Sequence, residues 1–173
     1  MSQLIAFIGV GNMGCPMAEN LMKAGKSVKV FDVSKKMLGI AKDRNLEIIK
    51  NFDDLITTDV ETVITMLPEG KHSKDVYLGE SGIINKVSKK CLLIDCSTID
   101  IQTSIEIGKK ASEKGIEMID APVSGGVMGA QKATLNIMVG GSKGAFKKAL
   151  PLLKIMGKNI FHAGDLGLSL IHI

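Results

Sequence analysis

Three glycines with the spacing Gly-x-Gly-x-x-Gly follow an apolar run near the amino terminus and open a segment with helical spacing. In this pattern Gly9 permits a tight turn, Gly11 lets a ligand approach the backbone, and Gly14 lets the helix pack closely on the strand. The free N–H groups and the partial positive charge at a helix N-terminus attract phosphate groups. The spacing and its context therefore predict a dinucleotide pyrophosphate site formed by Gly9, Val10, Gly11, Asn12, Met13 and Gly14.

A carboxylate, Asp32, ends the strand that is expected after this helix. A carboxylate at that position accepts hydrogen bonds from the adenosine ribose and repels a 2′-phosphate, which favours NAD over NADP. The alternative is that Asp32 only caps the turn between the strand and the next helix. The sequence predicts NAD as the cofactor and Asp32 as the residue that selects it.

Strand-like and helical segments alternate along the chain. Short apolar runs predict strands at 4–9, 28–31, 48–49, 63–67, 92–94, 116–119, 135–139 and 160–161. Helical spacing with serine or glycine boundaries predicts helices at 12–24, 34–44, 100–114 and 143–156, the last of them kinked by Pro151. Continuous apolar strands are typical of parallel sheets covered on both faces. We therefore expect an α/β fold with a doubly wound, mostly parallel sheet of Rossmann type.

Three further segments with possible binding roles follow predicted strands. Ligands of doubly wound sheets collect at the carboxyl ends of the strands, so all three segments are expected to face the cofactor. The last one is a Ser-Gly-Gly turn, which can direct backbone N–H groups and a hydroxyl at one carboxylate. The alternative is an ordinary glycine turn without a binding role, which has the same sequence pattern. The segments comprise Met66, Leu67 and Pro68, then Thr98, and finally Ser124, Gly125 and Gly126.

Four motifs together, FIGVGNMG, TMLP, DCST and DAPVSGG, resemble those of the 3-hydroxyisobutyrate dehydrogenase family of β-hydroxyacid dehydrogenases over residues 3–167. The resemblance implies hydride transfer between NAD and 3-hydroxyisobutyrate, with methylmalonate semialdehyde as product, as in valine catabolism. It implies that Leu67, Pro68 and Thr98 contact the cofactor, with Met66 in the same site, and that the Ser-Gly-Gly turn holds the substrate carboxylate. Ala133 stands where relatives usually carry glycine, so the identity of the acid is less defined than its class.

The resemblance also implies a residue that this chain lacks. Hydride transfer from an alcohol needs a group that accepts the hydroxyl proton, and the family uses a lysine in a G-x-G-x-x-x-K stretch. The segment Gly164-Asp165-Leu166-Gly167 leads into that stretch, and Ile173 occupies the lysine position. Neither His162 nor His172 is expected to replace the lysine. We therefore expect a chain that binds the dinucleotide and has no catalytic residue of its own.

The expected organisation is an NAD-binding domain over 1–167 and a truncated or aberrant tail over 168–173, without the helical domain of the family. Two alternatives remain open. A tartronate semialdehyde (2-hydroxy-3-oxopropionate) reductase shares the motifs, and the absent lysine favours a non-catalytic NAD(H)-binding module. The Ser-Gly-Gly turn argues against that module, because a sensor of NADH has no use for a carboxylate site.

The composition excludes several other classes of protein. The chain has 173 residues, 45% hydrophobic and 23% charged, which is typical of a globular protein. Its net charge of +4 does not indicate nucleic-acid binding, because Arg44 is the only arginine and the paired lysines read as solvated surface. No apolar run approaches the length of a membrane helix.

Three cysteines without metal-ligand spacing predict reduced thiols, no metal and a cytoplasmic protein. The expected partners are a small 3-hydroxy acid and, for the longer parent protein, a second copy in a homo-oligomer.

Overall fold

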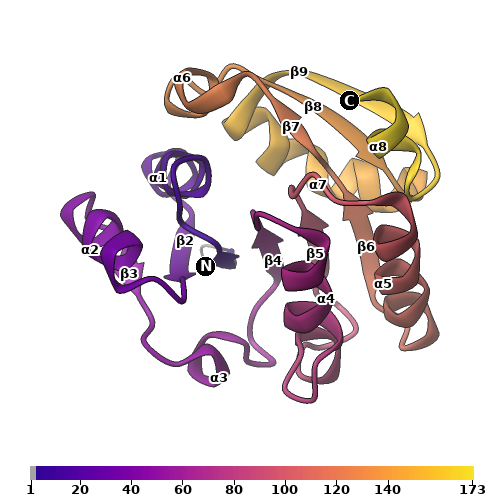
Figure 1. Cartoon of the computed structure of the whole chain (residues 1–173), viewed down its shortest axis with the longest axis horizontal. Helices are drawn as coiled ribbons and strands as arrows, with labels where there is room; N and C mark the ends of the chain where they lie inside the picture. The colour runs from indigo at the N-terminus through magenta and orange to yellow at the C-terminus, as the bar shows by residue number, and fades with distance from the viewer. Residues whose placement is uncertain (1–2) are drawn as a thin grey trace.

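The computed structural model describes residues 3–173, and within them one sheet has the strand order β3-β2-β1-β4-β5-β6-β8-β7, with β9 paired to β8 (Figure 1). The strands are β1 Leu4–Ile8, β2 Ser27–Phe31, β3 Glu47–Ile48, β4 Thr62–Thr65, β5 Leu92–Asp95, β6 Glu117–Asp120, β7 Val123–Ser124, β8 Leu135–Gly140 and β9 Gly157–Gly164. The helices are α1 Gly14–Lys23, α2 Lys35–Asp43, α3 Phe52–Leu55, α4 Gly70–Leu78, the 3₁₀ turn η1 Ile83–Asn85, α5 Ile101–Glu113, α6 Gly126–Gln131, α7 Lys143–Met156 and α8 Leu168–His172.

The pairing from β3 to β6 is parallel throughout, as are β8 and β9, whereas β8 runs antiparallel to β6 and β7. The prediction of a doubly wound, mostly parallel sheet is therefore confirmed. The strand order reverses at β1, which has β2 on one side and β4 on the other. Doubly wound sheets bind ligands at such a reversal, outside the carboxyl ends of the strands.

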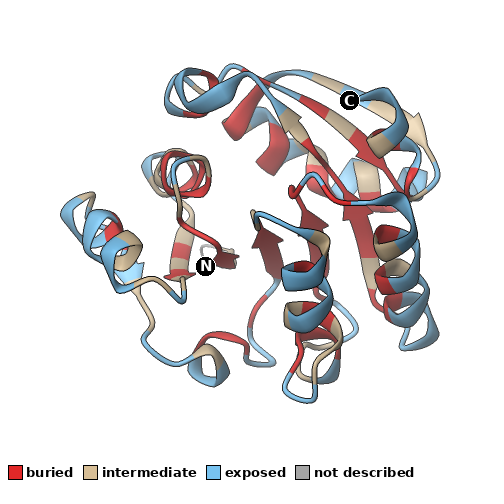
Figure 2. Cartoon of the chain, viewed as in Figure 1, coloured by how far each residue is buried: buried red, intermediate tan, exposed pale blue. Residues whose placement is uncertain are grey.

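Both faces of the sheet are covered, so β1 sends apolar side chains to two cores. Phe7 belongs to the same buried cluster as Met17 of α1 and Leu153 of α7, on one face. Ile8 belongs to the cluster on the other face, which includes Tyr77 of α4 and Ile107 of α5. Figure 2 shows the central strands β4, β5 and β6 almost fully buried and the outer sides of the helices exposed. Burying each large apolar side chain stabilises the fold by roughly 1.5–3 kcal/mol, so these strands form a rigid base for the loops at their ends.

Several elements lack a clear sequence signal and appear only in the structure. These are α3, α4, η1, α6, α8 and the two-residue strand β7. β9 is longer than predicted, and α7 remains helical through Pro151. The residues after 167 are ordered into α8, with Ser169 buried and Gly167 in the left-handed conformation at φ 90°. Among residues 3–173, no helix is both long and apolar enough to cross a membrane.

Candidate functional site

A cleft of about 580 Å³ opens where the strand order reverses. The glycine-rich turn after β1 and the end of β2 form one wall, and the turn after β4 with the exposed side of α4 forms the other. The lining residues are Ile8, Gly9, Gly11, Asn12, Met13, Gly14, Phe31, Asp32, Val33, Met66, Leu67, Pro68, His72, Asp75 and Val76. Nine of the residues predicted to bind the cofactor thus lie together in one cleft.

The three glycines of the fingerprint meet different surroundings. Gly9 has φ 91°, and a Cβ there would lie 2.3 Å from the Met66 carbonyl oxygen. A Cβ on Gly14 would lie 1.8 Å from the Gly9 oxygen and 3.1 Å from the Phe7 ring, so any side chain would separate α1 from β1. A Cβ on Gly11 meets nothing within 4 Å, because this position faces the open cleft. The cleft therefore has room for a pyrophosphate against the backbone at Gly11, next to the N-terminus of α1.

The Asp32 carboxylate connects the two turns of this wall. Its Oδ2 accepts the Val10 N–H at 2.9 Å, and its Oδ1 accepts the Ser34 N–H at 2.8 Å. The bond to Ser34 has the turn-capping geometry that was the alternative interpretation of Asp32. The same side chain also lines the cleft, so capping the turn and facing a ligand are compatible. Val10 itself is buried, and only its backbone takes part.

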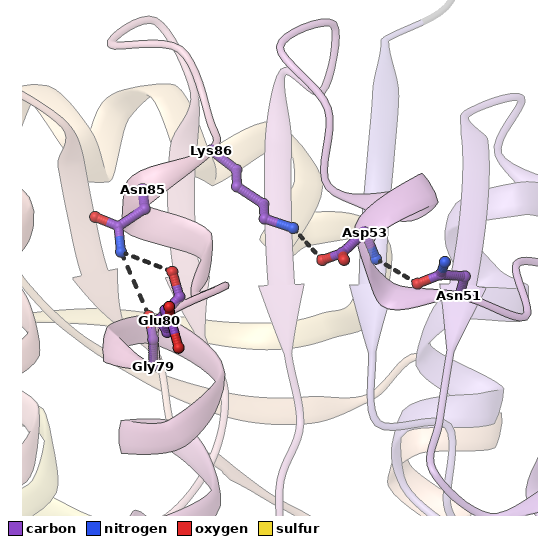
Figure 3. Close-up of polar contacts among 6 residues, drawn as sticks. All are labelled: Asn51, Asp53, Gly79, Glu80, Asn85 and Lys86. Carbon is purple, nitrogen blue, oxygen red and sulfur yellow. Dashed lines mark hydrogen bonds and ion pairs between the residues drawn. The ribbon is translucent and has the colours of Figure 1, made fainter.

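Aromatic contacts support this wall from behind. Phe31 lines the cleft and packs edge-to-face on Phe52 of α3, with 5.6 Å between the ring centroids. The Lys86 ammonium lies 6.0 Å from the centre of the Phe52 ring and pairs with Asp53. Asn51 caps α3 by accepting the Asp53 N–H at 3.0 Å (Figure 3). The short helix α3 is thus held between β2 and the segment after η1.

The opposite wall contains residues that the sequence analysis missed. His72, Asp75 and Val76 of α4 line the cleft there, and on the first wall Val33, which follows Asp32 and is 92% exposed, was missed as well. A helix over 70–78 was not predicted, because its polar residues lack a clear helical pattern of apolar positions. Only the packing of α4 beside β4 brings these side chains to the cleft, so no local signal identified them.

The remaining predicted binding residues lie outside the cleft lining. Thr98 is exposed after β5, and the Ser-Gly-Gly turn is exposed between β7 and α6. Gly125 and Gly126 have φ values of 135° and 64°, conformations that disfavour other residues. The α6 helix packs on α1, where the Asn20 side-chain amide donates to the Ala130 carbonyl at 2.7 Å. The turn therefore lies at the same end of the sheet as the cleft without being part of it.

Neither of the histidines considered as substitutes for the family lysine, His162 and His172, is among the residues that line the cleft. The His162 ring stacks on Phe146 at 4.7 Å between centroids, and its Nε2 lies 2.7 Å from the Gly141 carbonyl oxygen. His172 and Ile173 are exposed at the end of α8. Among residues 3–173, no cluster of three or more potential metal-binding side chains occurs.

The three thiols are all buried. Cys15 lies in the first turn of α1 beside the fingerprint, and burial raises its pKa. Burial also raises the pKa of Cys91 to about 12 and that of Cys96 even further. Thiols with raised pKa values are poor nucleophiles, so the geometry favours a packing role for Cys15 over a reactive one.

Comparison with known proteins places this geometry in a family. Residues 4–164 match the family described as the NAD binding domain of 6-phosphogluconate dehydrogenase. A 3-hydroxyisobutyrate dehydrogenase of Pseudomonas aeruginosa is 48% identical over 166 residues, which are 94% of this chain and 54% of that protein. An NAD-dependent L-serine dehydrogenase of the same organism is 42% identical over 94% of this chain and 54% of its own length.

A solved structure agrees with these matches. The 3-hydroxyisobutyrate dehydrogenase of Mycobacterium tuberculosis, determined with L-serine, superposes with a TM-score of 0.93 at 35% identity. The superposition covers 99% of this chain and 58% of that one. The chain therefore spans about half the length of the relatives it matches. The resemblance seen in the motifs is confirmed: the chain belongs to the family of NAD-binding domains shared by 6-phosphogluconate dehydrogenase and 3-hydroxyisobutyrate dehydrogenase.

Proposed function

We propose that this chain is the cofactor-binding half of an NAD-dependent 3-hydroxyacid dehydrogenase whose substrate is 3-hydroxyisobutyrate. The cleft beside the glycine fingerprint supports binding of the dinucleotide, and the 48% identity to a protein named for this reaction supports the substrate. Bound NAD supplies the hydride acceptor. The protein holds the pyrophosphate on backbone N–H groups at the start of α1 and the adenosine ribose on Asp32.

The main observation in favour of NAD over NADP is that the Asp32 carboxylate lines the cleft. It lies beside the backbone of Val10, with the apolar side chain of Val33 next to it. A 2′-phosphate at this point would meet a negative charge, and neither residue supplies the cation that usually compensates it. We therefore expect NADH to bind more tightly than NADPH, by at least about tenfold, which corresponds to about 1.4 kcal/mol.

Fluorescence titration of the 173-residue chain with both reduced cofactors tests this proposal. Asp32→Asn removes the charge and keeps a hydrogen-bonding oxygen, so it is expected to narrow the preference for NADH over NADPH. Asp59→Asn is the matched control, because Asp59 is exposed and does not line the cleft, so the preference of this variant for NADH over NADPH is expected to stay that of the wild type. Equal affinity of the wild type for the two cofactors would contradict the role of Asp32.

The Ser-Gly-Gly turn supplies the proposed substrate contact. Its backbone N–H groups and the Ser124 hydroxyl are exposed at the carboxyl end of the sheet, where one carboxylate can bind. 3-Hydroxyisobutyrate and L-serine both carry a carboxylate and a 3-hydroxyl group. A turn that binds the carboxylate therefore supports a 3-hydroxy acid as the substrate class, and it does not distinguish between these two acids. Ser124→Ala is expected to weaken substrate binding and leave NADH affinity unchanged.

Proton transfer requires a residue that the chain lacks. Because Ile173 occupies the family lysine position, we propose that these 173 residues bind NAD(H) without turnover. An assay for NADH formation from NAD and 3-hydroxyisobutyrate, glycerate or L-serine tests this, and formation of NADH would contradict it. Tartronate semialdehyde reduction by the longer protein and a non-catalytic binding role remain the two alternatives. The cytoplasmic location and the homo-oligomeric state of the parent stay predictions.

A further inference from the structure

A buried carboxylate, Asp95, ends β5 opposite the last residue of β4. Thr65 is its partner in the parallel register, and Asp95 is 1% exposed. One of its oxygens, Oδ1, accepts the Thr65 hydroxyl at 2.9 Å and the Ser97 N–H at 3.0 Å. Because the single hydroxyl proton of Thr65 is used on Asp95, the Tyr77 hydroxyl donates to Thr65 across 2.7 Å. The bonds therefore run from α4 through β4 to β5.

The same network continues to the wall of the cleft. Ser97, which Asp95 orders through its backbone, accepts the Leu67 N–H on its hydroxyl oxygen at 2.8 Å. Leu67 lines the cleft between Met66 and Pro68. The turn after β4 is thus bonded to the turn after β5, and the shape of this wall depends on one carboxylate oxygen.

The helix α4 takes part through its opposite sides. Ser73 and Tyr77, one turn apart, point to the buried cluster and are fully buried. His72 and Val76, on the exposed side, line the cleft. Fixing the inner side of α4 therefore also fixes the side chains that it presents to the cleft.

The second carboxylate oxygen has no comparable role. Within residues 3–173, Asp95 Oδ2 and Ser73 Oγ are the buried side-chain atoms without a hydrogen-bond partner. Burial raises the pKa of Asp95, and the neighbouring hydroxyls of Ser97, Thr65 and Ser73 counteract that rise. An amide oxygen at the place of Oδ1 would accept the same two bonds, while its NH₂ group could donate to Ser73. The network thus requires the acceptor at Oδ1 and not the negative charge.

We propose that Asp95 is a positioning residue for dinucleotide binding, which it serves by ordering Thr65 and Ser97 and, through them, Leu67 and α4. The inference rests on the proposed function, because the wall that it shapes is the wall of the proposed cofactor cleft. Asp95 does not touch the cofactor. Its effect passes through backbone geometry, which must place the cleft wall within a fraction of an ångström.

Cofactor affinity and amide exchange of the full 173-residue chain test this proposal together. Ser97→Ala removes the acceptor of the Leu67 N–H, so NADH affinity is expected to fall about tenfold. Hydrogen exchange at Leu67 should accelerate, while exchange at the Cys96 amide, which donates to Thr65 at 2.8 Å within the sheet, stays slow. Asp95→Ala should weaken NADH binding at least as much. Asp95→Asn should retain the affinity within about threefold, because the amide oxygen replaces Oδ1.

The control is Ser104→Ala. Ser104 is a buried serine that donates to the carboxylate of Asp120 at 3.1 Å, on the neighbouring strand, without a bond to the cleft wall. This variant loses a comparable hydrogen bond and is expected to bind NADH as the wild type does. If Ser97→Ala and Ser104→Ala weaken NADH binding equally, or if Asp95→Asn binds as poorly as Asp95→Ala, the proposal is wrong. If the wild type fails to bind NADH, the proposed function fails, and an unchanged Leu67 exchange rate in Ser97→Ala would separately overturn the network.

Discussion

Asp95 and Asp120 are register partners at the carboxyl ends of β5 and β6, and both carboxylates are buried. Asp95 bonds to the turns beside the cofactor cleft. Asp120 accepts hydrogen bonds from Ser104, from the Gly167 N–H and from the Ser169 hydroxyl, so it binds α5 and the start of α8. Two adjacent strands therefore end in carboxylates that order different loops. Because burial raises the pKa of both groups, each is held at a cost in stability near neutral pH.

Asp95→Asn is expected to stabilise the fold at neutral pH. The pKa of Asp95 in the folded chain lies above its ordinary value of 3.8, so its contribution to stability is fully present below pH 3.8 and is lost as the pH rises through the folded-state pKa. The gain of Asp95→Asn over the wild type should therefore be larger at neutral pH than below pH 3.8. Urea unfolding at the two pH values measures this difference. A gain that is the same at both would show that ionisation of Asp95 has no part in it.

Ser169→Ala should loosen α8 without affecting the cofactor cleft. The variant removes one of the donors to Asp120, and a lost buried hydrogen bond typically costs about 1 kcal/mol, or roughly a fivefold change in a local opening equilibrium. Amide exchange over 168–172 should accelerate by that factor, while exchange in α1 and NADH affinity remain unchanged. Ser112→Ala is the control, because Ser112 is exposed on α5. Unchanged exchange in α8 would show that Asp120 does not hold it.

Ala133→Gly is expected to stabilise the chain by about 1 kcal/mol, the ordinary penalty for a non-glycine residue in the left-handed region. Ala133 has φ 55° in the connection from α6 to β8. Asn45 is the comparison, since it has φ 63° but belongs to a residue type that tolerates this conformation. Chemical denaturation should therefore show a clearly smaller gain for Asn45→Gly. A destabilised Ala133→Gly would mean that the methyl group packs favourably.

Gly11→Ala should separate cofactor binding from folding. Its Cβ meets no neighbour within 4 Å, so the chain should unfold at an unchanged denaturant concentration, but the methyl group enters the cleft and NADH affinity should fall about tenfold or more. Gly39 in α2 offers the same open space, because a Cβ there also meets nothing within 4 Å, and it lies away from the cleft. Gly39→Ala should leave NADH affinity unchanged and raise stability by about 0.5–1 kcal/mol through helix propensity. Normal NADH binding by Gly11→Ala would place the pyrophosphate elsewhere.

The features that could be predicted from the sequence are those that depend on residues close together in the chain. The glycine fingerprint combines a strand, a turn and the start of a helix between Leu4 and Gly14, and the apolar runs of β1, β4 and β5 can only be buried in a sheet covered on both faces. The parallel order of the sheet and the family followed from these local patterns, and both are confirmed. The positions of Asp32 and of the turn after β4 followed from the rule that ligands collect at the carboxyl ends of strands.

The remaining features depend on segments that are distant in the chain. The helix α4 has no strong apolar pattern, so its contribution of His72 to the cleft appears only once it packs beside β4. The bond from Leu67 to Ser97 spans 30 residues, and the bond from Ser169 to Asp120 spans 49. The amino-acid sequence by itself thus determined the fold, the family and the glycine-rich turn after β1, because each is encoded in short-range spacing. Only the tertiary structure decided which buried hydroxyl meets which carboxylate, because those pairs form when the order of the strands brings distant loops to the same edge of the sheet.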